Sequence, residues 1–97
     1  MRTVDDTTAA EVAELFSTLA DASRVRIIAA LAAAELNVGE LAVEVDLTHS
    51  AVSHHLRQLR QMRLVKARKD GRYVYYRLDD EHVEELFRCG LEHVRHG

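Results

Sequence analysis

The chain has too few cysteines for a disulfide framework and no apolar run long enough for a membrane helix. Cys89 is the single cysteine among 97 residues, which excludes an internal disulfide and predicts a reducing, cytoplasmic environment. The longest apolar run, residues 27–34, has eight residues, whereas a membrane-spanning helix needs about 20. Acidic residues at positions 5 and 6 stand where a secretion signal would carry its apolar segment. The sequence therefore predicts neither a secreted nor a membrane-spanning protein.

The length predicts a single domain over residues 1–97. A hydrophobic content of 47% and a charged content of 30% are ordinary for a globular chain. A chain this short can bury only a thin core. We therefore expect part of its apolar surface to be covered by a second copy of the chain.

The charge is distributed unevenly along the chain. The net charge of −3 argues against binding to nucleic acid, but residues 54–78 carry eight basic residues and one acidic residue, a net charge of +7. The rest of the chain carries five basic and fifteen acidic residues, a net charge of −10. This polarity is typical of a protein that presents one face to a polyanion such as DNA. The alternative is a basic stretch that is merely solvated.

Three helices are predicted in the N-terminal half. The first has Thr7 or Thr8 as its N-cap and one apolar face, formed by Val12, Leu15, Phe16 and Leu19. The second begins after Asp21, a favourable N-cap. The third covers residues 38–45, after the alanine-rich pattern breaks at residues 35–37.

A fourth helix is predicted from Thr48, its N-cap, to about Met62. Its inner face comprises Val52, His55, Leu56 and Leu59. Its opposite face carries small hydroxyls, histidine and arginine, at Ser50, Ser53, His54, Arg57 and Gln61. A helix that reads the major groove needs such a surface, because the base edges offer hydrogen-bond donors and acceptors.

After residue 64 the apolar period changes from about 3.6 to 2, which predicts strands at residues 65–68 and 73–78. They are joined through Lys69-Asp70-Gly71-Arg72, whose Asp-Gly pair is typical of a tight hairpin turn. A last helix follows from about Asp80 nearly to Gly97. The order predicts a mainly α fold with a small β-hairpin wing, the winged helix-turn-helix.

This fold assigns roles in DNA binding. Base edges would be met by Ser50, Ser53, His54 and Arg57. Phosphates would be met by Arg68, Lys69 and Arg72 on the hairpin, and by Thr48 and His49 at a helix N-terminus. A hydrolase built on a histidine–aspartate pair has little support, because no serine or cysteine nucleophile lies in a recognisable turn. We expect no enzymatic activity.

Four potential metal ligands lie on the last predicted helix: Asp80, His82, His93 and His96. His82 and His93 share one face to within about 20°, but they are about 16.5 Å apart along the helix axis. A single zinc ion, with bonds of about 2 Å, cannot join them. An antiparallel second copy would complete two equal sites, each with three imidazoles and one carboxylate, a set suited to tetrahedral zinc. The alternative is a polar surface in which Asp80 serves as an N-cap.

Residues 47–59 closely resemble the recognition-helix signature of the ArsR/SmtB family of bacterial metal-responsive repressors. The stretch reads Leu47-Thr48-His49-Ser50-Ala51-Val52-Ser53-His54-His55-Leu56-Arg57-Gln58-Leu59. The likeness extends from about Ala13 to His96. It implies a homodimer formed through the first and last helices, in which the metal-free protein binds an inverted-repeat operator. Metal binding then lowers the DNA affinity and releases genes for metal efflux or sequestration.

The resemblance also implies which metal is sensed. The four ligands match the spacing of the last-helix site in zinc, cobalt and nickel sensors of the family. Its arsenic, cadmium and lead sensors carry thiolates where this chain has Asn37 and Gly39. Residues 1–6 offer none of the histidines that nickel and cobalt sensors recruit, which favours zinc, with cobalt and nickel as alternatives.

The resemblance implies a route from the metal to the DNA as well. The free ring nitrogen of His93 would donate to the main-chain carbonyl of Arg63, just after the recognition helix. A redox-sensing or constitutive repressor of the same fold is the alternative, with Cys89 as the reactive group. We otherwise expect Cys89 to be a buried small residue near the dimer axis.

Overall fold

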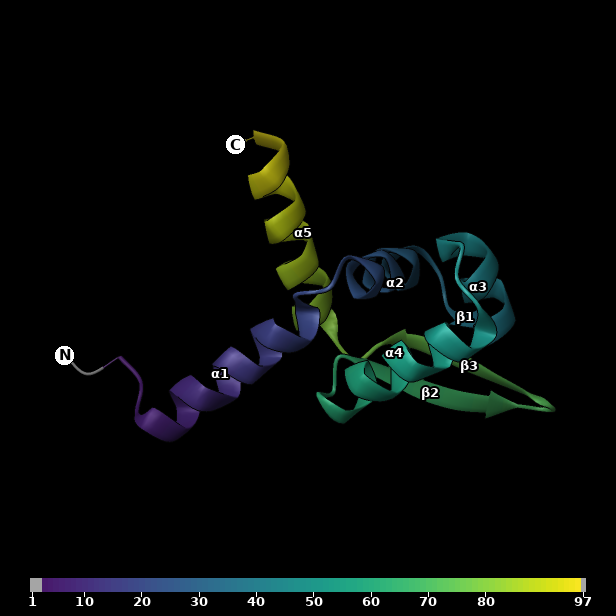
Figure 1. Ribbon diagram of the computed structural model, residues 1–97, viewed down its shortest axis with the longest axis horizontal. Helices are drawn as coiled ribbons and strands as arrows, with labels where there is room; N and C mark the ends of the chain where they lie inside the picture. The colour runs from purple at the N-terminus through teal and green to yellow at the C-terminus, as the bar shows by residue number, and fades with distance from the viewer. Residues whose placement is uncertain (1–2, 97) are drawn as a thin grey trace.

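The computed structural model describes residues 3–96. Most helices and strands pack together around one core, and the first and last helices extend away from it (Figure 1). The elements are α1 (Asp6–Leu19), α2 (Ala22–Ala33), β1 (Leu36–Asn37), α3 (Val38–Val45), α4 (His49–Gln61), β2 (Val65–Asp70), β3 (Tyr73–Leu78) and α5 (Glu81–His96). The predicted winged helix-turn-helix is confirmed. Within this described part, no helix is long and apolar enough to cross a membrane.

The sheet has three antiparallel strands in the order β1-β3-β2. The short strand β1 was not predicted; it pairs Leu36 with Tyr76 of β3. The hairpin turn is also tighter than predicted, because Asp70 still pairs with Tyr73 and only two residues remain in the turn. Gly71 has φ +64°, the conformation that two-residue turns with glycine first require.

Side-chain caps start helices α1, α2, α3 and α4. Asp21 and Thr48 cap α2 and α4 as predicted, each accepting from the main-chain N–H three residues later at 3.1 Å. The prediction for α1 was wrong: Asp5, not a threonine, is the N-cap, and its Oδ1 accepts from the N–H of Thr8 at 2.7 Å. Helix α3 has a full capping box between Asn37 and Glu40, which satisfies two otherwise unpaired N–H groups.

The core lies among α2, α3, α4 and the start of β2. Its largest fully buried side chains are Ile27, Leu41, Val52, Leu56, Leu59 and Val65. Three of them, Val52, Leu56 and Leu59, recur at helical spacing on α4. The inner face of α4 therefore packs into the core. In contrast, α1 has no buried residue and α5 has only Val83. These two helices therefore expose apolar surface that a single chain leaves uncovered.

Candidate nucleic-acid interface and metal centre

The outward face of α4 carries the side chains predicted to meet base edges. Ser50, Ser53, His54 and Arg57 are all exposed, and the opposite face of α4 is held by the buried Val52, Leu56 and Leu59. His49 is exposed beside them in the first turn. The hydroxyl of Thr48 is engaged in the helix cap. The fold therefore presents a polar face of α4 to solvent.

A shallow hollow separates α4 from the wing and contains a residue that the sequence reasoning missed. Arg60 lines it together with Ser53, Arg57, Gln61 and Tyr76. Arg60 and Arg57 are three residues apart on the helix, so their side chains are neighbours. That spacing was the available signal for a second arginine at this face. The pair gives the hollow the charge that suits a phosphate group.

His55 lies at the side of α4, and it is not a simple member of the apolar face. Its Nδ1 accepts a hydrogen bond from Nε of Arg24 on α2 at 3.1 Å. Nη1 of Arg24 also donates to the carbonyl of Thr18 at the end of α1, at 3.2 Å. Arg24 therefore joins α1 to the recognition helix, and the acceptor role of Nδ1 leaves the ring proton on Nε2.

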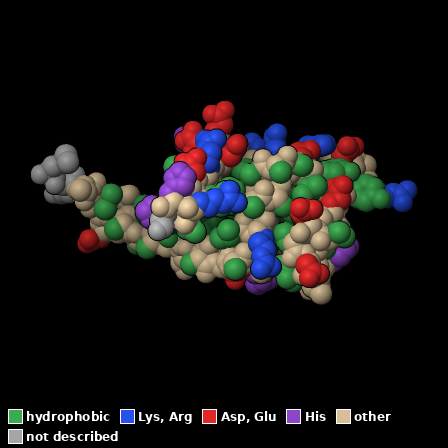
Figure 2. All heavy atoms as spheres, turned by 90° about the horizontal axis from the view of Figure 1, so that it is seen from above, with side chains coloured by type: hydrophobic (Ala, Val, Ile, Leu, Met, Phe, Trp, Pro, Cys, Tyr) green, Lys and Arg blue, Asp and Glu red, His purple; other side chains and the backbone are tan. Residues whose placement is uncertain are grey.

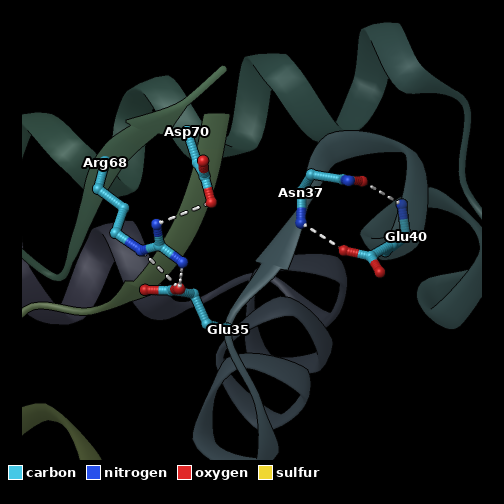
Figure 3. A network of polar contacts seen from close by, with 5 residues as sticks. All are labelled: Glu35, Asn37, Glu40, Arg68 and Asp70. Carbon is cyan, nitrogen blue, oxygen red and sulfur yellow. Dashed lines mark hydrogen bonds and ion pairs between the residues drawn. The ribbon is translucent and has the colours of Figure 1, made fainter. Parts of the chain in front are cut away.

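The wing carries basic side chains in two different states. Lys69 and Arg72 are exposed at its tip. Arg68 is engaged within the chain: its Nε donates to Oε1 of Glu35 at 2.7 Å, and its Nη1 lies 3.5 Å from Oδ2 of Asp70 (Figure 3). The hydrogen bond from Arg68 lowers the pKa of the Glu35 carboxyl. This ion pair therefore competes with the predicted contact between Arg68 and a DNA phosphate.

Asp80 and His82 lie together at the start of α5. Oδ1 of Asp80 accepts from the main-chain N–H groups of His82 at 2.9 Å and Val83 at 3.3 Å, so Asp80 caps the helix. Its Oδ2 is 3.5 Å from Nδ1 of His82. Desolvation raises the pKa of Asp80, but the hydrogen bonds from Val83 and His82 together outweigh it, and the net pKa is lowered. A carboxylate and an imidazole that can act as ligands are thus held side by side.

His93 and His96 lie at the other end of the same helix. With Cys89 and Glu92 they line a shallow hollow, and all four are exposed. Cys89 was expected to be buried and is exposed in the single chain. Within residues 3–96 of one chain, no three candidate ligands come together. The separation of the two pairs of candidate ligands agrees with the spacing expected from helix geometry.

Arg63 lies close to the candidate ligands Asp80 and His82. It has φ +55° in the turn that ends α4, and it lines one hollow together with Asp80, His82 and Leu15. The end of the recognition helix and half of the candidate metal site therefore share one surface.

An apolar groove of about 450 Å³ runs between α1, α2 and α5. Its walls include Phe16, Leu19, Leu86 and Leu91. In the space-filling view from above, histidine side chains and exposed apolar side chains lie near one another toward the α1 end of the molecule (Figure 2). Over the rest of that face, charged side chains are interspersed with hydrophobic and other atoms (Figure 2).

This chain resembles known proteins in sequence and in fold. A family profile described as bacterial regulatory protein, arsR family, matches residues 21–67. The transcriptional repressor SmtB homolog of Synechocystis sp. is 52% identical, over 90% of this chain and 66% of that protein. The cadmium resistance transcriptional regulatory protein CadC homolog of Staphylococcus aureus is 41% identical, over 88% and 71%. The chain thus spans about two thirds of the length of these curated relatives.

A solved structure gives the same picture. A homodimeric winged helix-turn-helix DNA-binding domain from Mycobacterium bovis superposes with a TM-score of 0.84 and 31% identity, over 98% of this chain and 91% of that chain. These relatives are named as transcriptional regulators and DNA-binding domains, which confirms the expectation of a regulator and not an enzyme.

Proposed function

This chain belongs to the arsR family of bacterial regulatory proteins, and from that premise we propose that it is a zinc-responsive transcriptional repressor. The metal-free homodimer binds an inverted-repeat operator, and zinc binding lowers its DNA affinity. The observation that supports the proposal is that two pairs of candidate ligands, Asp80 with His82 and His93 with His96, lie at opposite ends of α5, next to an apolar groove. A regulator of this kind acts in the cytoplasm.

A second copy is the natural occupant of the groove. Its walls come from α1 and α5, the two helices with almost no buried residue of their own. The Mycobacterium bovis relative is named as homodimeric. If the partner's α5 lies antiparallel, Asp80 and His82 meet His93 and His96 of the partner subunit. Two-fold symmetry then gives two equal sites.

The donor set fits zinc. Three imidazoles and one carboxylate make a four-coordinate site with no position open for catalysis. Thiolate ligation at the start of α3 is excluded by the residues themselves, because Asn37 is an N-cap and Gly39 has no side chain. The cadmium-resistance relative therefore does not indicate a cadmium site at that position. Cobalt and nickel, which also bind imidazole, are the alternatives.

The coupling to DNA passes through His93 and Arg63. Arg63 lines one hollow with Asp80 and His82, so the partner's His93 would lie beside Arg63 if it shared a metal with these two residues. The ring nitrogen that does not bind metal donates there to the main-chain carbonyl of Arg63, and metal ligation fixes the tautomer that can do so. Arg63 follows α4 directly, so this bond biases the spacing of the two recognition helices.

Cobalt titration of the metal-free protein, followed by optical absorption, tests the metal site. Intense visible bands that saturate at one cobalt per chain and are displaced by zinc support the proposal. Weak bands at the same stoichiometry favour six-coordinate nickel or cobalt sensing. His96→Ala should abolish the bands, whereas Arg95→Ala, at the exposed neighbouring position, should not. Absence of any saturable spectrum would refute the metal site and direct attention to the exposed Cys89.

Subunit mixing tests whether each site is shared between chains. The Asp80→Ala/His82→Ala and His93→Ala/His96→Ala variants should each bind no cobalt. Their heterodimer contains one complete site, so an equimolar mixture should regain between about a quarter and a half of a site per chain, from random exchange to metal-driven pairing. If either variant alone keeps full stoichiometry, the site does not cross the dimer.

A further inference from the structure

The wing and the helix-turn-helix meet at the short segment of residues 35–37, which lies between α2 and α3. Asn37 closes the capping box of α3 with Glu40 (Figure 3). Two residues earlier, Glu35 receives Nε and Nη2 of Arg68, which lies 33 positions further along the chain. One short segment thus starts the first helix of the helix-turn-helix and also binds the wing.

The ion pair spans the whole sheet. The strand order β1-β3-β2 places β3 between Arg68 and the segment that carries Glu35. Arg68 and Asn37 both pair with Tyr75 of β3, from opposite sides. The Arg68 guanidinium lies 5.2 Å from the centre of the Tyr75 ring, within the range of a cation–π contact. The side chain of Arg68 therefore crosses the central strand to reach Glu35.

Few hydrogen-bond donors of the Arg68 guanidinium remain available for DNA. Nε and Nη2 are directed at Glu35 and Nη1 at Asp70 (Figure 3), so two carboxylates surround one positive charge. The side chain of Glu35 is only 26% exposed, against 49% for Arg68, so the pair is partly shielded from solvent. Lys69 and Arg72, at the exposed tip, have no such partner among the ion pairs of the described residues.

We infer that Arg68 is a positioning residue, whose ion pair with Glu35 holds the wing at a fixed angle to the recognition helix and leaves the phosphates to Lys69 and Arg72. Only the part of this inference that concerns phosphate contacts rests on the proposed function. A wing held in place before binding does not have to be ordered when DNA arrives, which is a cost that flexible segments bear.

The two possible roles of Arg68 predict different salt dependence. The test is the binding of the metal-free protein to a mixed-sequence 20-base-pair duplex, followed by fluorescence anisotropy at several sodium chloride concentrations. Arg68→Gln should weaken binding by about five-fold at most, the range of an exposed ion pair, with the salt slope unchanged. The matched control Lys69→Gln removes the same charge one residue away and should lower the slope by about 0.9. A loss of about 0.9 in the slope of Arg68→Gln would overturn the inference.

Replacing Glu35 by glutamine changes the DNA affinity in opposite directions under the two possible roles of Arg68. If Arg68 positions the wing, Glu35→Gln weakens DNA binding even though it removes a negative charge from the interface. If Arg68 contacts phosphate, Glu35→Gln frees it and tightens binding. Asp70→Asn is the matched control for loss of a nearby negative charge, since Asp70 is more exposed and its contact is longer. Tighter binding by Glu35→Gln than by Asp70→Asn contradicts the inference.

A measurement without DNA separates this inference from the proposed function. The ¹⁵N heteronuclear NOE of residues 69–72 reports the mobility of the wing tip on the fast timescale. It should fall in Glu35→Gln and in Arg68→Gln, and stay as in wild type in Lys69→Gln. If the wild-type chain does not bind duplex DNA, the proposed function fails and this comparison alone decides the role of Arg68. An unchanged NOE in Glu35→Gln rejects it.

Discussion

The proposed dimer can be weakened at Phe16 without disturbing the fold of the single chain. Phe16 lines the apolar groove and is 54% exposed, on a helix that contains no buried residue. Full burial of an aromatic side chain removes about 150–250 Å² from water, so roughly 100 Å² remains for a partner to cover. At about 25 cal/mol per Å² this is worth about 2.5 kcal/mol. Symmetry doubles the loss in Phe16→Ala to about 5 kcal/mol, or three to four powers of ten in the dimer Kd.

Sedimentation velocity over nanomolar to micromolar concentrations measures this shift. Val43→Ala is the control, because Val43 is 83% exposed on α3 and lies outside the groove. It should leave the dimer Kd unchanged, and both variants should keep the helical circular dichroism of wild type. A Phe16→Ala protein that dimerises as tightly as wild type, or a Val43→Ala protein that does not, would refute the assignment of the groove.

Three further predictions concern local structure. Asn37→Ala removes the acceptor for the Glu40 N–H and should lower the free energy of unfolding in urea by about 1 kcal/mol; an unchanged midpoint would contradict a structural role for the capping box. Gly71→Ala meets no neighbouring atom but must adopt φ +64°, which should cost about 1 kcal/mol and lower the Tm. The main-chain N–H of Arg24 lowers the pKa of Asp21 below its ordinary 3.8. The cap therefore stabilises the fold above pH 3.8 and loses this effect as the pH falls through the lowered pKa, so the stability difference between wild type and Asp21→Asn should vanish in acid.

Local signals were sufficient for most of the helices. The caps at Asp21 and Thr48 were predicted because each precedes an apolar helical pattern and accepts a bond within three residues. The same rule failed at α1, where two threonines stood nearer to the apolar face than Asp5. A carboxylate accepts a main-chain N–H more strongly than a hydroxyl does, and that preference locates the cap at Asp5.

The sequence pattern could not predict pairing between segments that lie far apart in the chain. Strand β1 has two residues and exists because β3, nearly forty positions later, pairs with it; no periodicity can appear in two residues. The roles of Asn37 and Glu40 were nevertheless readable, because asparagine followed three residues later by glutamate is the spacing of a capping box.

Charge counting identified the basic segment but could not say which charges are free. Arg68 was assigned to phosphate because it is a basic residue of the hairpin, within a stretch of net charge +7. Its partner Glu35 comes from the acidic remainder of the chain and reaches it only through the folded sheet. A net charge sums residues without regard to pairs, so intrachain neutralisation is visible only in the structure.

Dimer formation and metal binding are coupled in the arrangement that we propose. A free chain offers two donors at either end of α5, Asp80 with His82 and His93 with His96, and no group of three within the described residues. A four-donor site exists only in the dimer, so metal strengthens the dimer, and any change that weakens the dimer weakens metal binding by linkage. Phe16→Ala must therefore lower cobalt affinity, although it removes no donor atom. Since the same metal must also weaken DNA binding, release of the operator follows from a changed spacing of the two α4 helices and not from dissociation of the subunits.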